Sequence, residues 1–152
     1  MISEKISIII PVKNSVAYIG DAIESVLQQT YPHKELIIID GGSTDGTLNI
    51  IEKHSTNIAY FISENDKGIY DAINKGIAKA SGACVYILGS DDKLHNEHVL
   101  EEIFTNEITS YDVIFGNVIN TGGTHVMVRK KHICKLTFTV IWRNTQHQQG
   151  VF

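Results

Sequence analysis

The sequence contains little cysteine and little proline, with two of each in 152 residues. Cys84 and Cys134 form no Cys-x-x-Cys pair, which argues against a zinc ribbon or a thioredoxin-type redox motif. The chain also lacks the run of about 18 apolar residues that a transmembrane helix needs. Its first apolar run is short and broken by Pro11, unlike the core of a signal peptide. We therefore expect a cytoplasmic setting.

An excess of positive charge is absent as well. The formal net charge of −4 at pH 7 argues against a broad electrostatic surface for nucleic acid. The single basic cluster, residues 129–131, fits a solvated turn or a contact with an anionic acceptor or a membrane surface. Three glycine-containing motifs are also missing: the P-loop, the dinucleotide-binding Gly-x-Gly-x-x-Gly and the Gly-x-Ser-x-Gly elbow. The enzyme classes built on those motifs are therefore not expected.

What is present is a regular alternation of two kinds of segment. Continuous apolar runs predict buried strands at 6–10, 36–39, 58–62 and 84–88. Apolar residues at helical spacing predict four helices, whose apolar positions begin at residues 19, 48, 69 and 99. Ser43, Thr44 or Asp45 would cap the second helix, and His95 or Asn96 would lie near the start of the fourth. Two more strands are predicted at 113–115 and 126–128. The chain is thus predicted to be one α/β domain, residues 1–152, with a mostly parallel sheet and helices on both faces.

Polar residues follow each of the first four predicted strands. In an open α/β sheet, ligands bind beyond the carboxyl ends of the strands, so these four loops should open on one edge. The loops are residues 11–14, 40–42, 64–68 and 89–92. A helix cap or a solvated turn would explain any one of them alone. Their coincidence with consecutive strand ends favours a ligand-binding site.

The acidic residues in these loops suit a nucleotide diphosphate held through a cation. Asp91 and Asp92 can supply oxygen ligands to Mg²⁺ or Mn²⁺, which would stabilise a departing diphosphate. The carboxylate of Asp40 can accept the N–H of a uracil ring, and the glycine that follows, Gly41, allows the backbone to approach closely. His95 and His98 lack a third ligand at a suitable spacing, so we do not expect zinc there.

Several of these segments resemble glycosyltransferase family 2, whose members have the GT-A fold. The opening strand and loop, residues 7–14, and the first-helix segment, residues 25–31, are similar to that family. So are three further segments: 35–47 (ELIIIDGGSTDGT), 66–76 (DKGIYDAINKG) and 88–92 (LGSDD). Where the family more often has an aromatic residue, this chain has Lys13. The resemblance extends over nearly the whole chain, and the motifs occur in the expected order.

The resemblance implies a role for each matching residue. Pro11, Val12 and Asn14 would line the nucleoside pocket, Asp40 would bind uracil and Asp45 would support that loop. Asp92 would hold the metal, and His147 is a further candidate for a metal or diphosphate contact. The predicted nucleotide-sugar-binding residues are Pro11, Val12, Asn14, Asp40, Gly41, Asp45, Lys67, Gly68, Ser90 and Asp91.

The activity implied is transfer of a sugar, with inversion, from a nucleotide sugar to an acceptor hydroxyl. The resemblance indicates a UDP-sugar donor and a glycan or lipid-linked acceptor, handled in the cytoplasm or at the inner face of the membrane. The family's catalytic base is a carboxylate downstream of the His147–Gln148 segment, so we expect it beyond Phe152 and expect the domain to be incomplete at its C-terminus. No catalytic residue is therefore identified. A nucleotide-sugar-binding remnant without transferase activity is the alternative, and a nucleotidyltransferase is less favoured because residues 11–14 do not form its glycine-rich loop.

Overall fold

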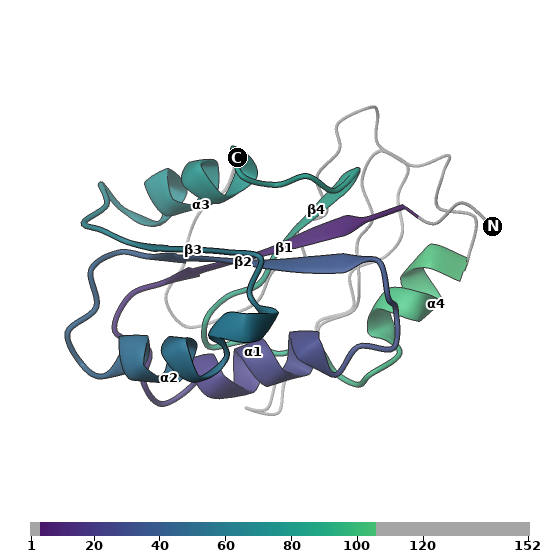
Figure 1. Ribbon diagram of the computed structural model, residues 1–152, viewed down its shortest axis with the longest axis horizontal. Coiled ribbons are helices and arrows are strands. Elements are labelled where there is room, and N and C mark those ends of the chain that lie inside the picture. The colour runs from purple at the N-terminus through teal and green to yellow at the C-terminus, as the bar shows by residue number, and fades with distance from the viewer. Residues whose placement is uncertain (1–3, 106–152) are drawn as a thin grey trace, which may run out of the picture.

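The structure, a computed structural model, describes residues 4–105 (Figure 1). Strands and helices alternate along this part of the chain, as the sequence predicts. The predicted strands at 113–115 and 126–128, the basic cluster 129–131 and His147 lie outside the described residues. In chain order, the elements are β1 (Ile6–Val12), α1 (Ile19–Leu27), β2 (Lys34–Asp40), α2 (Thr47–Lys53), the 3-10 helix η1 (Ser55–Asn57), β3 (Tyr60–Ser63), α3 (Ile69–Ile77), β4 (Cys84–Ile87) and α4 (Val99–Thr105).

The four strands form one parallel sheet in the order β3-β2-β1-β4. Strand β1 is central, and all seven of its residues are buried, as expected for a strand covered on both faces. Its register pairs Val12 with Asp40, so β1 and β2 end side by side. The four loops predicted to carry ligand-binding residues therefore leave the sheet at the same edge, which we call the carboxyl edge.

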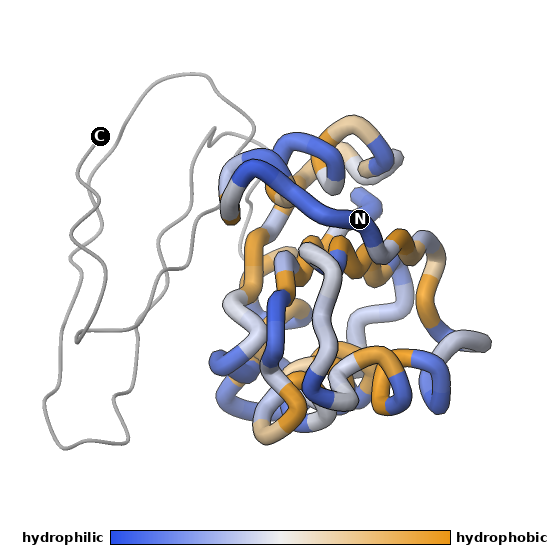
Figure 2. Tube along the Cα trace, turned by 90° about the vertical axis from the view of Figure 1, so that its left-hand side faces the viewer, coloured by the Kyte–Doolittle hydropathy of each residue, from blue (hydrophilic) through white to orange (hydrophobic). Residues whose placement is uncertain are grey.

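Helices cover both faces of the sheet, as predicted. On one face, α1, α2 and α4 pack against alternate strand residues such as Ile8, Ile10 and Ile38. On the other face, Ala72 of α3 packs against Ile9, and a Cβ on Gly76 would meet the Ile9 side chain at 2.5 Å. Figure 1 shows α3 above the sheet with α1 and α2 below it, and Figure 2 shows hydrophobic segments in the middle of the described part of the chain. In the described part, no helix is long and apolar enough to cross a membrane.

Two local predictions are wrong in detail. Strand β3 begins at Tyr60, not at residue 58, because Ser55–Asn57 form a 3-10 turn first, and its residues are only alternately half-buried because β3 lies at the edge of the described sheet. Helix α2 is capped by Gly46, whose φ of 101° is left-handed, and no side chain serves as its cap. Asp45 instead accepts a hydrogen bond from the N–H of Thr47 at 3.0 Å.

A carboxylate ties the opposite edge of the sheet together. Glu35 at the start of β2 accepts hydrogen bonds from Lys5 Nζ at 2.6 Å, from Ser7 Oγ at 2.5 Å and from the Ser81 N–H at 2.7 Å. Burial raises the pKa of Glu35, but these hydrogen bonds outweigh burial and lower the pKa to about 2. The single side chain thus joins β1, β2 and the connection between α3 and β4.

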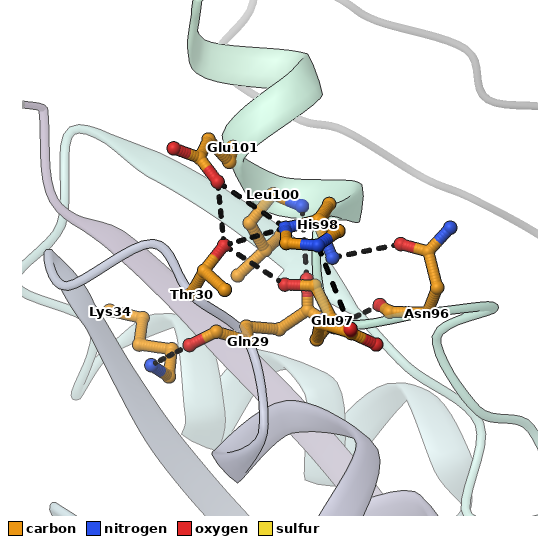
Figure 3. Close-up of polar contacts among 8 residues, drawn as sticks. All are labelled: Gln29, Thr30, Lys34, Asn96, Glu97, His98, Leu100 and Glu101. Atoms are coloured by element: carbon orange, nitrogen blue, oxygen red, sulfur yellow. Dashed lines mark hydrogen bonds and ion pairs between the residues drawn. The ribbon is translucent and has the colours of Figure 1, made fainter.

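The segment between β4 and α4 is held against helix α1 by an ion pair and hydrogen bonds. Lys93 lies 3.6 Å from Asp21 near the start of α1, and the Leu94 N–H donates to Ser25 Oγ at 3.1 Å. At the other end of α1, the buried amide of Gln29 donates to the Asn96 carbonyl at 2.5 Å and accepts the Leu100 N–H at 3.0 Å (Figure 3). These contacts fix the chain immediately after Asp92, so they hold the predicted metal-binding turn against a rigid helix.

Candidate functional site

The loops after β1 and β2 are joined by hydrogen bonds. Asn14 has a left-handed φ of 50°, a conformation that asparagine adopts more readily than most residues. Its Oδ1 accepts a hydrogen bond from the Thr44 N–H at 2.9 Å. Its own N–H donates to Ser43 Oγ at 2.7 Å. Asp45 accepts the Val16 N–H at 3.0 Å. The sequence placed Asn14 and Asp45 at one edge, and the structure adds that they brace the two loops against each other.

Asp45 is anchored chiefly by its neighbour Thr47. The Thr47 hydroxyl donates to Asp45 Oδ1 at 2.6 Å, and this bond, outweighing a small effect of burial, lowers the pKa of Asp45. The same hydroxyl accepts the Ser15 N–H at 2.8 Å, and Thr47 is fully buried. Asp45 thus stays ionised and supports both loops, in keeping with the supporting role implied for it.

Asp40, the predicted uracil acceptor, is fully buried at the end of β2. Its Oδ2 accepts the N–H groups of Gly42 at 3.0 Å and Ser43 at 2.9 Å, and the Ser63 hydroxyl at 2.6 Å. The Ser43 hydroxyl donates to Oδ1. The carboxylate therefore organises the loop that follows it and joins β2 to the end of β3. Whether it also binds a base stays a prediction.

The loop after β3 lies directly over the two glycines that follow Asp40. A Cβ on Gly41 would meet Asp66 Oδ2 at 2.4 Å, and a Cβ on Gly42 would meet Asn65 Oδ1 at 2.6 Å. The Gly68 N–H donates to Asp66 Oδ1 at 3.0 Å, which holds that carboxylate in place. A larger residue at position 41 would therefore displace the Asp66 carboxylate, a contact that the sequence did not predict.

Lys67 and Gly68 lead from this loop into helix α3. The Lys67 N–H donates to Asp71 at 3.1 Å, and this bond is the largest of several that lower the pKa of Asp71. Lys75 pairs with Asp71 at 3.1 Å and with Glu64 at 2.8 Å. Its ammonium group thus joins the start of the β3 loop to the first turn of α3. The Lys67 side chain is exposed at the carboxyl edge, next to Asp66.

The turn after β4 brings two carboxylates to one point. A Cβ on Gly89 would meet Asp92 Oδ2 at 2.8 Å and Asp91 Oδ1 at 3.1 Å, so both side chains converge on the space that this glycine leaves open. The Ser15 hydroxyl donates to the Ser90 carbonyl at 3.3 Å and links this turn to the β1 loop. Burial and, second, the charge of Asp92 raise the pKa of the buried Tyr86, so its phenol stays neutral.

This pair of carboxylates fits a hard divalent cation. Mg²⁺ and Mn²⁺ prefer oxygen ligands, and Mg²⁺ is usually held by only one or two carboxylates together with water and substrate phosphates. Residues 4–105 contain no group of three or more His, Cys, Asp or Glu side chains that could hold a metal ion. A cation at Gly89 would therefore depend on a ligand such as a diphosphate for its remaining oxygens.

The structure brings the predicted residues to one edge, although not all as exposed side chains. Val12 is buried in the core cluster that includes the apolar face of α1, and Pro11 is buried within β1, so their lining of a nucleoside pocket stays a prediction. The sequence did not predict a site role for Asp66 or for the three residues whose hydroxyls hold Asp40 and Asp45, which are Ser43, Thr47 and Ser63. Ser43, Thr47 and Asp66 lie within the motifs quoted above, but their spacing does not reveal these contacts.

Comparison with known proteins gives a family match over almost the whole chain. The family model described as Glycosyl transferase family 2 matches residues 7–150. A PGL/p-HBAD biosynthesis glycosyltransferase of Mycobacterium bovis (strain BCG / Pasteur 1173P2) is 36% identical over 124 residues, which are 78% of this chain and 48% of that protein. Glycosyltransferase AglE of Haloferax volcanii is 36% identical over 127 residues, covering 78% of this chain and 42% of that protein. The chain thus spans about half the length of the curated relatives it matches.

Solved structures of two glycosyltransferases have a similar fold. S. aureus TarS 1-349 in complex with UDP-GlcNAc has a TM-score of 0.71 and 27% identity, covering 82% of this chain and 37% of that chain. The mannosyltransferase PcManGT of Pyrobaculum calidifontis, in complex with GDP-Man and Mn²⁺, has a TM-score of 0.69 and 21% identity, covering 79% of this chain and 37% of that chain. At that identity, the second likeness is evidence for the fold alone.

Proposed function

This chain belongs to glycosyl transferase family 2 and has the GT-A fold, and from that premise we propose that it binds the donor of a sugar-transfer reaction. The donor is a nucleotide sugar with a UDP leaving group, and the acceptor is a hydroxyl of a glycan or lipid-linked glycan at the cytoplasmic face of the membrane. Transfer proceeds by a single displacement that inverts the anomeric carbon.

The observation that carries this proposal is the convergence of Asp91 and Asp92 on Gly89 at the carboxyl edge. A diphosphate is repelled by carboxylates, and a divalent cation held between the two aspartates and the ligand would offset that repulsion. The turn after β4 is hydrogen-bonded to the β1 loop through Ser15 and Ser90, and the β1 loop is hydrogen-bonded in turn to the β2 loop. These three loops of the site are thus joined to one another by hydrogen bonds before any ligand arrives.

Each group at this edge has a role in the proposed reaction. Asp92 and Asp91 would hold Mg²⁺ or Mn²⁺, which supplies a Lewis acid for the departing diphosphate. The exposed Lys67 places a second positive charge beside the β3 loop, where it can bind a phosphate oxygen or the donor sugar. Asn14 and Asp45 keep the nucleoside side of the site in place, so little reorganisation is needed on binding.

The choice of UDP rests on likeness. TarS, a solved neighbour at 27% identity, is in complex with UDP-GlcNAc. A carboxylate at the nucleoside side of the site suits a base that donates an N–H, which uracil does. The glycan acceptor is proposed from two relatives, one named for PGL/p-HBAD biosynthesis and one for teichuronic acid biosynthesis.

Titration calorimetry of UDP into the folded chain, with and without Mn²⁺, tests the proposal. We expect UDP to bind at least about 10-fold more tightly with Mn²⁺, because the cation bridges the diphosphate and the two aspartates. UMP, which lacks the second phosphate, should gain much less from Mn²⁺. A folded chain that binds UDP neither with nor without Mn²⁺ would overturn the donor-site proposal.

A further inference from the structure

The carboxylate that the sequence assigns to the nucleobase is fully engaged within the protein. Asp40 is 0% exposed. Its two oxygens accept four hydrogen bonds, from two backbone N–H groups and from the hydroxyls of Ser43 and Ser63. An ionised carboxylate offers about four acceptor positions, so a ligand N–H could reach Asp40 only by displacing one of these donors. The geometry of Asp40 is that of a group that shapes a loop.

The backbone next to Asp40 has a second carboxylate above it. Gly41 does not have a left-handed φ, so its conformation alone does not demand glycine. The restriction on the size of residue 41 comes from Asp66, whose Oδ2 would lie 2.4 Å and whose Cγ would lie 3.0 Å from a Cβ at that position. The Asp66 carboxylate therefore occupies the space into which any larger side chain at residue 41 would project.

Asp66 is held firmly and is still accessible. Its Oδ1 accepts the Gly68 N–H at 3.0 Å, and the residue is only half-buried, in contrast to Asp40. The loop beneath it is fixed, since the Glu64 N–H donates to the Asp40 carbonyl at 3.0 Å. An oriented carboxylate with solvent access can accept a ligand N–H as a charge-assisted hydrogen bond without prior rearrangement.

We propose that Asp66 is the residue that selects the nucleobase by accepting its ring N–H, and that Asp40 is a positioning residue that holds the loop beneath it. This inference rests on the proposed function, since it names the group that recognises the base in that site. Uracil donates its ring N3–H to such a carboxylate. Cytosine has an unprotonated N3 in the same place, so its lone pair would face the carboxylate. The site should therefore discriminate UDP from CDP.

The test compares UDP with CDP in titrations of the whole chain with Mn²⁺ present. We expect wild type to prefer UDP by about 10-fold or more, the value of one charge-assisted hydrogen bond. Asp66→Asn should reduce the ratio of the two affinities to near one, because the amide can donate to cytosine N3 as readily as it accepts from uracil. Gly41→Ala should also reduce the ratio, since its Cβ must displace the Asp66 carboxylate.

Two further variants separate base selection from loop structure. Asp40→Asn should weaken UDP and CDP by similar factors and lower the melting temperature, leaving the UDP preference in place. As a control, Glu52→Gln removes an exposed carboxylate from α2, outside the loops of the site, and should leave both affinities unchanged.

The outcomes distinguish this inference from the proposed function. An Asp66→Asn variant that keeps the full UDP preference, or an Asp40→Asn variant that alone abolishes it, would overturn the assignment of Asp66 and leave the donor site standing. Equal affinity of wild type for UDP and CDP would also overturn it. Failure of folded wild type to bind either nucleotide would overturn the donor site and this inference together.

Discussion

Asp92→Asn should remove the metal dependence of UDP binding. With Mn²⁺ present, we expect the affinity for UDP to fall by about 30- to 100-fold, and without metal by less than about 3-fold. The physical reason is that only two described carboxylates, Asp91 and Asp92, converge at Gly89. The substitution halves the negative charge that the protein offers to the cation, and the neutral amide oxygen that replaces the carboxylate is a weaker ligand.

Calorimetry of UDP binding with and without Mn²⁺ measures this effect. Glu52→Gln is the control, because it removes an exposed carboxylate near the end of α2 and leaves the contacts around the turn after β4 intact. The control should bind UDP as wild type does, in either condition. If Asp92→Asn kept the full gain from Mn²⁺, the cation would have to bind elsewhere.

Glu35→Gln should destabilise the chain by about 2–3 kcal/mol at pH 7, in proportion to the lowered pKa of that carboxylate. The Glu35 side chain is only 10% exposed and takes its hydrogen bonds from Lys5, Ser7 and Ser81, so little solvent screens them. Glutamine fits the same space, but it carries no charge to pair with Lys5. The measurement is the free energy of unfolding in urea.

The loss should disappear in acid. The pKa of Glu35 is about 2 in the folded chain, against the ordinary 4.5 of a glutamate, so the folded state binds its proton less readily than the unfolded state does. The stabilisation is therefore complete above about pH 5 and is lost as the pH falls toward 2. Wild type and Glu35→Gln should differ most near pH 7 and converge near pH 2. Glu24→Gln, at an exposed position on α1, should show no such pH-dependent difference, and a constant gap for Glu35→Gln across the range would contradict the account.

Most of the fold could be predicted from the sequence because periodicity records burial. Strand β1 is apolar at nearly every position and is buried at every position, and the helical spacing of Ile19, Ala22, Ile23 and Val26 matches the buried face of α1. The prediction failed where a local contact overrides the pattern. Ile58 and Ala59 continue the apolar run of β3, but the 3-10 turn before them delays the strand to Tyr60.

The candidate site was predictable in place and less so in detail. The rule that ligands bind beyond the carboxyl ends of parallel strands located Asp40, Asp91 and Asp92. It could not tell a saturated carboxylate from an accessible one, because one of the donors to Asp40, the Ser63 hydroxyl, is 23 residues away in the chain. Nor could it place Asp66 over Gly41, since that contact joins two loops whose separation depends on the fold.

The most direct test of the central claim is nuclear magnetic resonance of the ¹⁵N-labelled chain with UDP, comparing Mg²⁺ with paramagnetic Mn²⁺. The account predicts that Mn²⁺ broadens the amide signals of residues 89–92 most strongly, then those of residues 14–16, 41–45 and 66–68, because these loops share the carboxyl edge. Glu35 and Ser81, at the opposite edge, should stay sharp. Broadening centred on any other part of the chain, or none at all in the presence of UDP, would contradict a metal-supported nucleotide site beyond β4.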